Sequence, residues 1–498
     1  MGRQDEIIKE RLKKLDELEN KGINPYPHKY EPKHTSAELQ EKYKKLKNET
    51  STKDKVKVAG RVVSIRDLGK IAFAAIQDGK GKIQVTLQEK ETPEKVRELF
   101  KRYIDTGDFI GVEGTIFRTK RGELSVLIKD IELLSKSILP LPEKWHGLQN
   151  KEERYRKRYI DLIINPEVRE VFEKREKIVD SIREFLKANG FNEVDTPYLQ
   201  TIYGGANAKP FETHLNALDI NLFLAISPEL YLKRLIVGGY DKVFTIARNF
   251  RNEGIDRWHN PEFTMMEIYQ AYADYNDMME LMEDLFIYVL KKVNGSTKIE
   301  FKGKTIDFKK PWKRMTMLEA IKKFAGIDAG NMSEKELFDF IEENKVEKKG
   351  NSWGWYVQSI FEHFCEEKLE QPTFIIDHPL ETTPLCKLHR NDKLCRLIER
   401  FEPFCAGAEL ANAYSELNNP ILQRTLLEEQ QKALTEGDEE ANPYDEDFVN
   451  ALEIGMPPTG GLGIGIDRMV MLLTGQESIR DVIMFPFMRP EVGNKESE

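Results

Sequence analysis

Residues 250–263 bring together many side chains that could do chemistry, in the segment FRNEGIDRWHNPEF. The alternating runs before and after it predict two antiparallel strands joined by this charged loop. Side chains two positions apart on a strand share a face, so arginine, glutamate and aromatic groups would meet on one side of the sheet. Such a face suits a ligand with charges of both signs and a flat ring, although a solvated loop would also be charged. The residues expected on this face are Asn249, Arg251, Phe263, Met265, Glu267 and Tyr269.

A second stretch, PPTGGLGIGIDRMVMLL at residues 457–473, is a glycine-rich strand that leads into a helix near Asp467. It lacks the Gly-Lys-Ser/Thr ending of a P-loop, and Arg468 stands where a dinucleotide-binding motif has its last glycine. Glycines on a strand let a flat ligand lie against bare backbone. Tight packing of the strand against the helix would need the same glycines, so both interpretations stay open.

A third stretch, ERFEPFCAGAELANAYSEL at residues 399–417, places polar side chains among small and apolar ones. Because no Lys or Arg is expected beside its carboxylates, they are predicted to hold a cation, either Mg²⁺ or an ammonium group. A solvated acidic face is the alternative. The polar candidates are Glu402, Glu409, Asn412, Tyr414 and Glu416.

The order of these patterns predicts several regions along the 498 residues. Residues 1–54 are helical and lysine-rich and are expected to form an arm outside any core. Residues 55–137 hold five short alternating segments with a helical piece after the third, which predicts an OB-type barrel. A linker is expected at 138–165, followed by a larger domain at 166–498 with a helical insertion at about 310–370.

Composition narrows the class of protein. The first 135 residues carry more Lys and Arg than Asp and Glu, whereas the whole chain has a net charge of −9, which suggests a polyanion-binding module on an acidic body. The four cysteines form no CxxC pair, so neither a zinc site nor a disulfide framework is favoured. No apolar run approaches the roughly twenty residues of a membrane span. A cytoplasmic protein without membrane contact is expected.

The helix ending in GFNEVDTP, the FRNEG hairpin and the GLGIGIDR junction together resemble the three signature motifs of class II aminoacyl-tRNA synthetases. SPELYLKRL and ANAYSEL extend the likeness to the class II lysyl-tRNA synthetases, from about residue 55 to Pro490. The resemblance implies an α+β fold, in which an N-terminal OB-fold β-barrel precedes a catalytic domain on a mostly antiparallel sheet with flanking helices. It also implies a homodimer.

The implied function is that of a lysine–tRNA ligase. Such an enzyme activates L-lysine with ATP to lysyl-adenylate, releases pyrophosphate, and transfers lysine to the 3′-terminal adenosine of tRNA(Lys). Arg251 and Arg468 are the implied catalytic residues, and they would act by positioning and electrostatic stabilisation without a nucleophile or a general base.

The resemblance also implies an ATP site. Arg251 would bind the lysine carboxylate and the α-phosphate, and Glu253 would accept from the adenine amino group. Phe263 would stack on adenine, while Arg468 would cover its other face and reach the γ-phosphate. Mg²⁺ ions bridging ATP oxygens are the implied cofactor. The implied ATP site is Arg251, Glu253, His259, Asn260, Phe263, Glu402, Glu409 and Arg468, with Glu402 and Glu409 as metal ligands.

A lysine site is implied in the same way. Glu229 would accept from the α-amino group, and Glu267, Tyr269 and Glu416 would surround the ε-ammonium, because a buried ammonium needs several acceptors. No cation is expected beside these residues. Tyr414 stands where relatives often have Phe. The implied lysine site is Gly205, Glu229, Arg251, Glu267, Tyr269, Asn412, Tyr414 and Glu416.

For the barrel, the resemblance implies that anticodon bases lie on the strand face. Phe73 would stack on a base, and Arg66, Gln84 and Glu123 would hydrogen-bond to base edges. A place for Phe73 in the barrel core is the alternative.

Three other functions fit parts of the sequence. A paralogue that loads lysine onto a protein would resemble the catalytic domain alone, so the OB-like segment argues against it. An aspartyl- or asparaginyl-specific enzyme is opposed by Glu229, Glu267 and Glu416. A non-catalytic tRNA-binding protein is opposed by the presence of Arg251, Glu402, Glu409 and Arg468.

Overall fold

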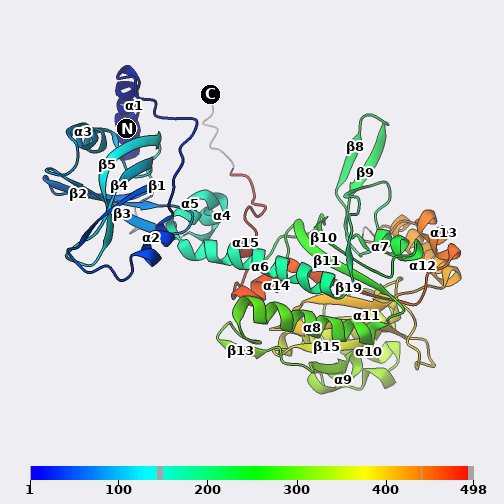
Figure 1. The fold of residues 1–498 in the computed structure, drawn as a ribbon. Helices are drawn as coiled ribbons and strands as arrows, with labels where there is room; N and C mark the ends of the chain where they lie inside the picture. The colour runs from blue at the N-terminus through cyan, green and yellow to red at the C-terminus, as the bar shows by residue number, and fades with distance from the viewer. Residues whose placement is uncertain (1, 143–147, 149, 439, 492–498) are drawn as a thin grey trace. The chain divides into compact units, whose positions relative to one another are not determined.

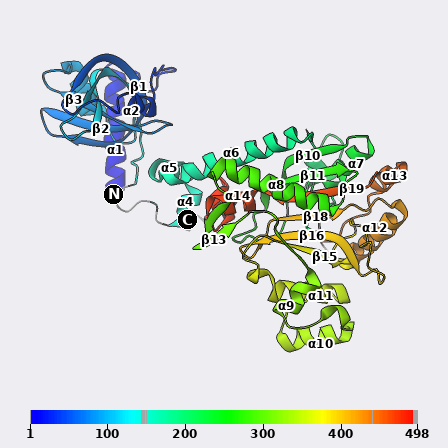
Figure 2. The same ribbon diagram turned by 60° about the horizontal axis from the view of Figure 1, so that its bottom comes forward.

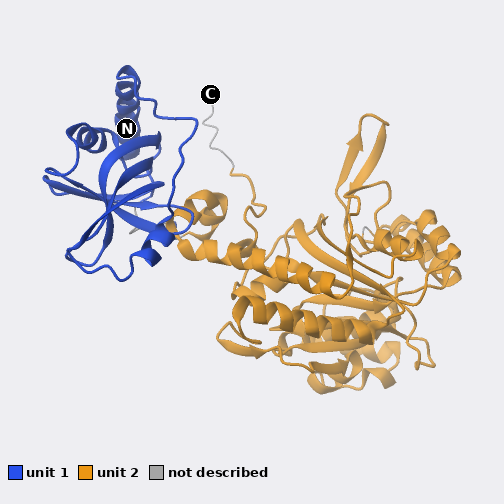
Figure 3. Cartoon of the chain, viewed as in Figure 1, with its two compact units in different colours: residues 1–149 blue, residues 150–498 orange. Residues whose placement is uncertain are grey.

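The computed structural model describes residues 2–142, 148, 150–438 and 440–491. The chain divides into two compact units, residues 1–149 and 150–498 (Figure 3). The predicted linker therefore spans the division between the units, and its residues 143–147 and 149 lie outside the described residues.

The first unit is built on a closed five-stranded barrel, as the alternating segments predict. Its strands follow the order β1-β2-β3-β5-β4, and helix α3 comes after the third strand (Figure 1). Every second residue of β2 is buried, namely Ala72, Ala74 and Ile76, because alternate side chains of a barrel strand point inward. The barrel elements are β1 (Ser51–Asp67), β2 (Ile71–Gln77), β3 (Lys82–Gln88), α3 (Glu94–Tyr103), β4 (Phe109–Arg118) and β5 (Leu124–Ser135).

The residues before the barrel differ from the expected arm outside any core. Helices α1 (Arg3–Asn20) and α2 (Ser36–Lys42) precede β1, and Leu18, Leu39 and Tyr43 are buried in the same apolar cluster as the barrel strands. Single apolar residues in a lysine-rich sequence give no sign of the tertiary surface that they cover. This segment is part of the first core.

The end of the expected linker also differs from the prediction. Residues 150–164 form α4 (Lys151–Arg156) and α5 (Arg158–Ile164) and belong to the second unit. The Arg158 guanidinium is buried. It donates to Asp161 over 2.7 Å and to the Arg480 carbonyl over 2.9 Å. A buried and paired charge of this kind holds the segment against the domain.

The second unit is centred on a mostly antiparallel sheet, which confirms the predicted α+β fold. Its main path is β14-β15-β16-β18-β19-β11-β10-β6, and β17 pairs with β16 (Figures 1 and 2). Only the β14–β15 and β10–β6 pairs are parallel among the described strands of this sheet. The strands are β6 (Asn192–Glu193), β10 (Lys242–Phe250), β11 (Glu262–Ala271), β14 (Lys313–Thr316), β15 (Thr373–Pro379), β16 (Leu397–Cys405), β17 (Ala408–Glu409), β18 (Ala411–Ser415) and β19 (Thr459–Gly465).

Three helices pack on one face of this sheet (Figure 2). They are α6 (Pro166–Ala188), α8 (Tyr275–Asn294) and α14 (Ile466–Thr474). Helix α6 begins with a proline in its first turn, and its buried residues recur at helical spacing, as predicted from the sequence. Because these helices cover one face, the opposite face is left for polar chemistry.

Further helices and small sheets surround the main sheet. The expected insertion at 310–370 is only partly separate, because β14 joins the sheet edge while α9 to α11 build a second core around Ile321, Ile341 and Phe361. These elements are α9 (Met317–Phe324), η1 (Ala329–Asn331), α10 (Glu334–Asn344), α11 (Trp353–Phe364), η2 (Glu366–Lys368) and η3 (Leu380–Thr382). The others are β7 (Leu199–Gln200), β8 (Glu212–Leu215), β9 (Ile220–Leu224), α7 (Glu229–Val237), β12 (Lys298–Phe301), β13 (Lys304–Asp307), α12 (Pro420–Thr435), α13 (Glu446–Ile454) and α15 (Ile479–Val482). Among the described residues, no helix combines the length and apolar character needed to cross a membrane.

Candidate active site

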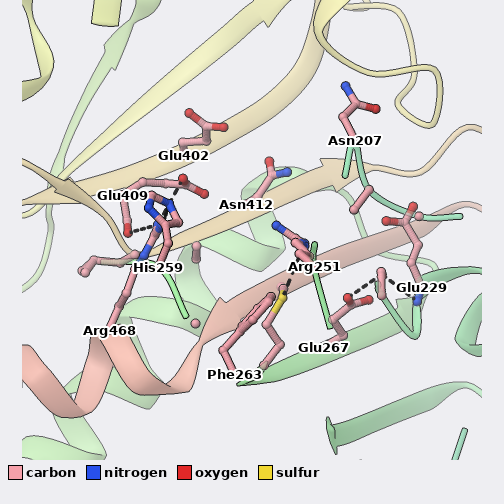
Figure 4. Close-up of a pocket in the computed structure, with 18 of the residues that line it drawn as sticks. Asn207, Glu229, Arg251, His259, Phe263, Glu267, Glu402, Glu409, Asn412 and Arg468 are labelled. Atoms are coloured by element: carbon pink, nitrogen blue, oxygen red, sulfur yellow. Dashed lines mark hydrogen bonds and ion pairs between the residues drawn. The ribbon is translucent and has the colours of Figure 1, made fainter. Parts of the chain in front are cut away.

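A cavity of about 360 Å³ lies in the second unit, on the sheet face that α6, α8 and α14 leave free. Its walls come from the β10–β11 hairpin, the β16–β18 strands, the β19–α14 junction and the start of α7 (Figure 4). Three stretches that lie far apart in the sequence therefore meet here. Of the residues implied for ATP and lysine, only Tyr269 and Glu416 do not line the cavity.

The hairpin places its aromatic and cationic groups in contact. Asn249 pairs with Phe263 across β10 and β11, and the Arg251 backbone amide donates to the Pro261 carbonyl, so Arg251 continues the strand register. Its guanidinium lies 5.1 Å from the centroid of the Phe263 ring. Arg251 Nε is buried without a hydrogen-bond partner among the described residues. A buried donor that lacks a partner is suited to an anionic ligand.

The β19–α14 junction supplies the second arginine. Arg468 Nη1 donates to the Glu409 carbonyl over 2.9 Å, and Arg468 Nη2 lies 3.2 Å from His259 Nε2. His259 Nδ1 is in turn 2.8 Å from Asp256. Arg468 therefore connects the strand at Glu409 with the hairpin loop, facing Arg251 and Phe263 across the cavity (Figure 4).

Helix α14 is fixed at its first turn by a contact that the sequence did not reveal. Buried Asp467 accepts from the Thr264 backbone amide over 2.7 Å and from Arg175 Nη1 over 2.5 Å. Arg175 Nη2 also donates to the Thr264 hydroxyl over 3.1 Å. The contact joins α6, β11 and α14 immediately behind Arg468.

Two carboxylates stand on the β16 and β17 strands. Glu402 and Glu409 line the cavity, and Glu409 pairs with Phe404 in the β16–β17 register. The expectation that no Lys or Arg lies beside them is wrong, because Arg400 pairs with Glu402 and Arg468 with Glu409. Burial nevertheless raises the pKa of Glu402 to about 7. The charge of Arg400 acts to lower this pKa, whereas the charge of Glu409 acts to raise it. Burial therefore disfavours the ionised form of Glu402 although Arg400 lies beside it.

These carboxylates fit Mg²⁺ bound together with a phosphate ligand. No cluster of three or more metal-binding side chains occurs in the part of the chain that the structure describes. Mg²⁺ characteristically uses one or two carboxylates and completes its shell with water and substrate phosphates. Burial is the main cause of the raised pKa of Glu402, and a cation bound together with the phosphates would favour the ionised form of this carboxyl.

Glu229 and Glu267 line the same cavity as Arg251, and with the buried Glu416 they form an acidic pocket. Ser227 Oγ donates to Glu267 over 2.8 Å, and Tyr269 Oη donates to the other Glu267 oxygen over 3.1 Å. Burial, supported by the charge of Glu229, raises the pKa of Glu267 to about 8. Tyr269 and Glu416 do not line the cavity themselves but are buried behind its lining, and Glu416 is fully buried.

A lysine of the protein lies in this pocket, against the expectation of no cation there. Lys233 Nζ donates to Glu229 Oε1 over 2.6 Å and is ion-paired with Glu416 Oε2. The Lys233 and Glu416 side chains are both fully buried. Burial raises the pKa of Glu416 to about 8 although Lys233 acts to lower it, and Glu416 Oε1 has no hydrogen-bond partner among the described residues.

Two glycines make room for these acidic side chains. A Cβ on Gly461 would overlap Glu416 Oε1 and the Tyr269 ring. Gly205 has a positive φ of 86°, and a Cβ there would lie 2.9 Å from Ser227 Oγ. Of the two interpretations of the glycine-rich strand, close packing holds at Gly461, but the packing partner is the acidic pocket and not the following helix.

The remaining predicted residues have local contacts. Asn412 Nδ2 donates to the Tyr414 hydroxyl over 2.6 Å, and Arg400 Nε donates to Asn412 Oδ1 over 2.9 Å. Asn260 is buried and donates to the Glu262 carbonyl over 2.6 Å, so its amide holds the hairpin loop. Burial raises the pKa of Glu253, which Arg251 opposes.

The four residues predicted on the barrel lie on neighbouring strands. Phe73 pairs with Arg66 on β1 and with Thr86 on β3, and it belongs to the alternating set of β2 that is not buried. Gln84 donates to Ser125 over 2.6 Å, and Glu123 is exposed just before β5. The core alternative for Phe73 is therefore wrong.

Several site residues went unnoticed in the sequence. Ser227 and Arg400 each stand two positions before a predicted residue. Lys233 stands four positions after Glu229, which places these two on one face of a helix. That spacing indicated a Glu–Lys pair. Its burial beside Glu416 depends on the packing of α7 against the sheet, which the sequence does not show.

Two family models match the chain. Residues 150–489 match the model described as tRNA synthetases class II (D, K and N), and residues 56–134 match an OB-fold nucleic acid binding domain. Both matches agree with the predicted fold and its order.

Curated relatives cover nearly the whole chain. A lysine–tRNA ligase of Methanoculleus marisnigri is 51% identical over 97% of this chain and 95% of its own length. Lysine–tRNA ligases of Pelotomaculum thermopropionicum, at 52% identity over 98% of this chain and 95% of the relative, and of Carboxydothermus hydrogenoformans, at 51% over 98% of both, are similarly related. With the cavity formed by its three motif stretches, this shows that the chain belongs to the class II tRNA synthetases and, within them, to the lysine–tRNA ligases.

Proposed function

We propose that the cavity of the second unit forms lysyl-adenylate from L-lysine and ATP and then transfers lysine to the 3′-terminal adenosine of tRNA(Lys). One observation carries the assignment to this cavity. Arg251, with a buried and unpartnered Nε, lies between an acidic pocket and a pair of arginine and aromatic groups. An amino acid on one side and a nucleotide on the other would therefore meet at a single cation.

In this proposal ATP binds between Phe263 and Arg468. The Phe263 ring would stack on adenine, and Glu253 would accept from its amino group. Burial raises the pKa of Glu253, and a hydrogen bond from adenine would satisfy this partly desolvated carboxyl. His259 and Asn260 would hold the loop around the phosphates, since both make contacts within the hairpin.

Lysine binds in the acidic pocket beside Arg251. Glu229 would accept from the α-ammonium, and Glu267, Tyr269 and Glu416 would surround the ε-ammonium. The open backbone at Gly205 and the amide of Asn412 would complete the enclosure, with the Tyr414 hydroxyl held by Asn412. Buried carboxylates without sufficient cations are suited to a ligand that brings ammonium groups.

The chemistry needs no protein nucleophile. The lysine carboxylate is already an anion and attacks the α-phosphorus, while the bond to the β-phosphate oxygen breaks and pyrophosphate leaves. Arg251 would stabilise the charge that develops on the α-phosphate, and Arg468 would hold the leaving group. Fixed donors in an enclosed cavity lower the barrier because they need no reorganisation.

Glu402 and Glu409 would hold Mg²⁺ when ATP is bound. The ion would neutralise phosphate charge and orient the phosphate chain. The protein's own contribution is to present these two carboxylates on adjacent strands while Arg400 and Arg468 fix their side chains.

The barrel is proposed to bind the anticodon of tRNA(Lys). The side chains of Arg66, Phe73, Gln84 and Glu123 come from adjoining parts of β1, β2, β3 and the start of β5. An aromatic ring flanked by polar groups on a barrel surface suits unstacked bases.

We propose a cytoplasmic location, where translation would use the product.

We also propose that two copies of the chain pair. Met484, Phe485 and Phe487 are exposed beside α6, next to a cavity of about 660 Å³ that Phe172 and Val179 also line. Exposed aromatic groups beside a cavity suit a self-complementary interface. Sedimentation of Phe485→Ser and Phe487→Ser chains should show monomers where the unaltered chain shows dimers.

Pyrophosphate exchange followed by tRNA charging tests the proposal. Lysine alone among the amino acids should stimulate exchange of labelled pyrophosphate into ATP, and purified tRNA(Lys) should then accept lysine. Exchange without charging would point to a protein as acceptor. Absence of lysine-dependent exchange would remove the cavity assignment.

A further inference from the structure

Among the described residues, Lys233 is the cation that is ion-paired within the acidic pocket. Lys233 projects from α7 one turn after Glu229, with its side chain fully buried. It does not line the cavity, whereas Glu229 does. Its ammonium therefore stands behind the carboxylates, on the side away from any ligand.

The neighbours of the Lys233 ammonium come from several elements. Glu229 on α7 and Glu416, directly after β18, are its ion-pair partners, and the Phe448 ring of α13 lies 5.9 Å away. The Cys386 thiol also lies near Glu416, and burial raises its pKa, so it is uncharged at neutral pH. Burial alone would lower the pKa of Lys233, but the charges of Glu229 and Glu416 outweigh the effect of burial. The pKa of Lys233 is therefore raised.

The charged side chains of the acidic pocket do not balance one another. Three carboxylates, Glu229, Glu267 and Glu416, face one ammonium, Lys233. Burial raises the pKa of Tyr269 and Tyr414, so both phenols are neutral. With every carboxylate ionised, the pocket has a charge equal and opposite to that of two ammonium groups, and Arg251 remains for a carboxylate.

We propose that Lys233 is a specificity-determining residue, a fixed counter-cation that matches the charge of the pocket to an amino acid with two ammonium groups. This inference rests on the proposed binding of lysine in the pocket. Without Lys233, one carboxylate more than the ligand can neutralise would be buried, and a buried unpaired carboxylate takes up a proton. That carboxyl would then no longer accept from a ligand ammonium.

The oxygen atoms of Glu416 show how one carboxylate would serve both cations. Oε2 is ion-paired with Lys233, while Oε1 lies against the bare Cα of Gly461, and neither oxygen has a hydrogen-bond partner among the described residues. A buried acceptor without a partner is costly unless a ligand supplies the donor. Lys233 thus holds the carboxylate in place and leaves its second oxygen for the ε-ammonium.

Lys233→Met and Lys233→Arg test the inference in the full-length enzyme. Methionine keeps the length and removes the charge, whereas arginine keeps the charge. In lysine-dependent pyrophosphate exchange, Lys233→Met should raise the lysine KM at least about tenfold while changing the ATP KM less than about twofold. Its preference for lysine over norleucine, which lacks the ε-ammonium, should fall by a similar factor. Lys233→Arg should restore most of the lysine KM and most of the preference for lysine over norleucine.

The pH profile separates charge matching from a merely structural role. Because Lys233 holds the pKa of Glu416 down, its loss should move the midpoint of kcat/KM for lysine to higher pH. An unmoved midpoint, or equal rises in the lysine and ATP KM, would overturn the proposal. So would a Lys233→Arg enzyme as impaired toward lysine as Lys233→Met.

Lys136 offers a matched control. It is also a fully buried lysine between two carboxylates, Asp105 and Asp108, but it lies in the first unit. Lys136→Met should lower the melting temperature and leave the lysine KM unchanged.

A measurement on the unaltered enzyme covers the case in which Lys233→Met does not fold. Calorimetric titration of lysine at pH 7 in buffers of different ionisation enthalpy should show proton release, because the pocket carboxyls must ionise. Net proton uptake on binding would overturn the charge matching, because a neutral carboxyl would then face a ligand ammonium group. Absence of lysine binding altogether would overturn the proposed function instead.

Discussion

Single side chains are proposed to decide which amino acid the pocket takes, and Glu416 gives the sharpest test. Glu416→Gln keeps the shape but removes the charge that faces both Lys233 and the proposed ε-ammonium. Truncating one partner of a buried charge pair costs about 2–5 kcal/mol, so the lysine KM should rise at least about tenfold and the ATP KM much less. Pyrophosphate exchange measures both.

Glu283→Gln is the control for this change. Glu283 is also a buried carboxylate, but it lies on α8, on the covered face of the sheet, and accepts from the Trp312 backbone amide. Its replacement should affect stability and not substrate requirements. If Glu416→Gln raised both KM values equally, Glu416 would not belong to the ammonium site.

The pocket carboxyls also predict a pH dependence. Burial raises the pKa values of Glu267 and Glu416 to about 8, so the pocket takes up protons as the pH falls below this value in the absence of lysine. Lysine binding favours their ionised forms, and affinity therefore rises with pH until about 8 and then levels off. The kcat/KM for lysine should fall as the pH drops from 8 to 6.5, by up to about tenfold per unit for each proton released. A flat profile over this range would contradict the protonation of these carboxyls.

At the scale of elements, one contact joins the helix that packs behind the sheet to the ATP side. Arg175 on α6 donates to Asp467 at the start of α14 and to Thr264 on β11. Arg175→Gln should loosen Arg468 and raise the ATP KM roughly tenfold, because hydrogen bonds between charged groups contribute about 1.5–3 kcal/mol. The lysine KM should change less.

Lys187→Gln serves as the control for α6. Lys187 lies on the same helix and pairs with Glu193, but it is exposed and far in sequence from the Asp467 contact. An ATP KM that rises equally in both variants would assign the effect to α6 as a whole.

Elements with a periodic pattern could be predicted, and contacts between distant elements could not. The β10–β11 hairpin and the five barrel strands follow from alternation, and the site residues on them from side-chain direction. The Lys233–Glu416 pair could not be predicted, because it depends on how α7 packs against the sheet. The same holds for Leu18 and Leu39, whose partners are barrel strands later in the chain.

At the scale of the molecule, the two units are predicted to divide recognition and chemistry between them. Phe73→Ala removes the ring proposed to stack on an anticodon base, and such stacking contributes about 1–3 kcal/mol per base. Charging of tRNA should lose roughly tenfold in kcat/KM, whereas pyrophosphate exchange, which needs no tRNA, should be unchanged.

Phe109→Ala is the matched change on the same barrel. Phe109 is partly exposed on β4 and stacks with Arg61, which pairs with Gln77 and not with Phe73 across β1 and β2. Charging that falls equally in both variants would indicate a general loss of barrel stability and not a base contact.

The burial of Leu18, Leu39 and Tyr43 in the barrel cluster bears on how this protein can be shortened. A recombinant chain started at Ser51 would leave the strands complete but strip apolar cover from them, and the exposed surface would favour aggregation during expression. Limited proteolysis of the whole chain should likewise spare the bonds next to these residues until the barrel itself melts. The lysine-rich segment before the barrel looks dispensable in the sequence. A stable fragment made to bind tRNA would nevertheless have to include it.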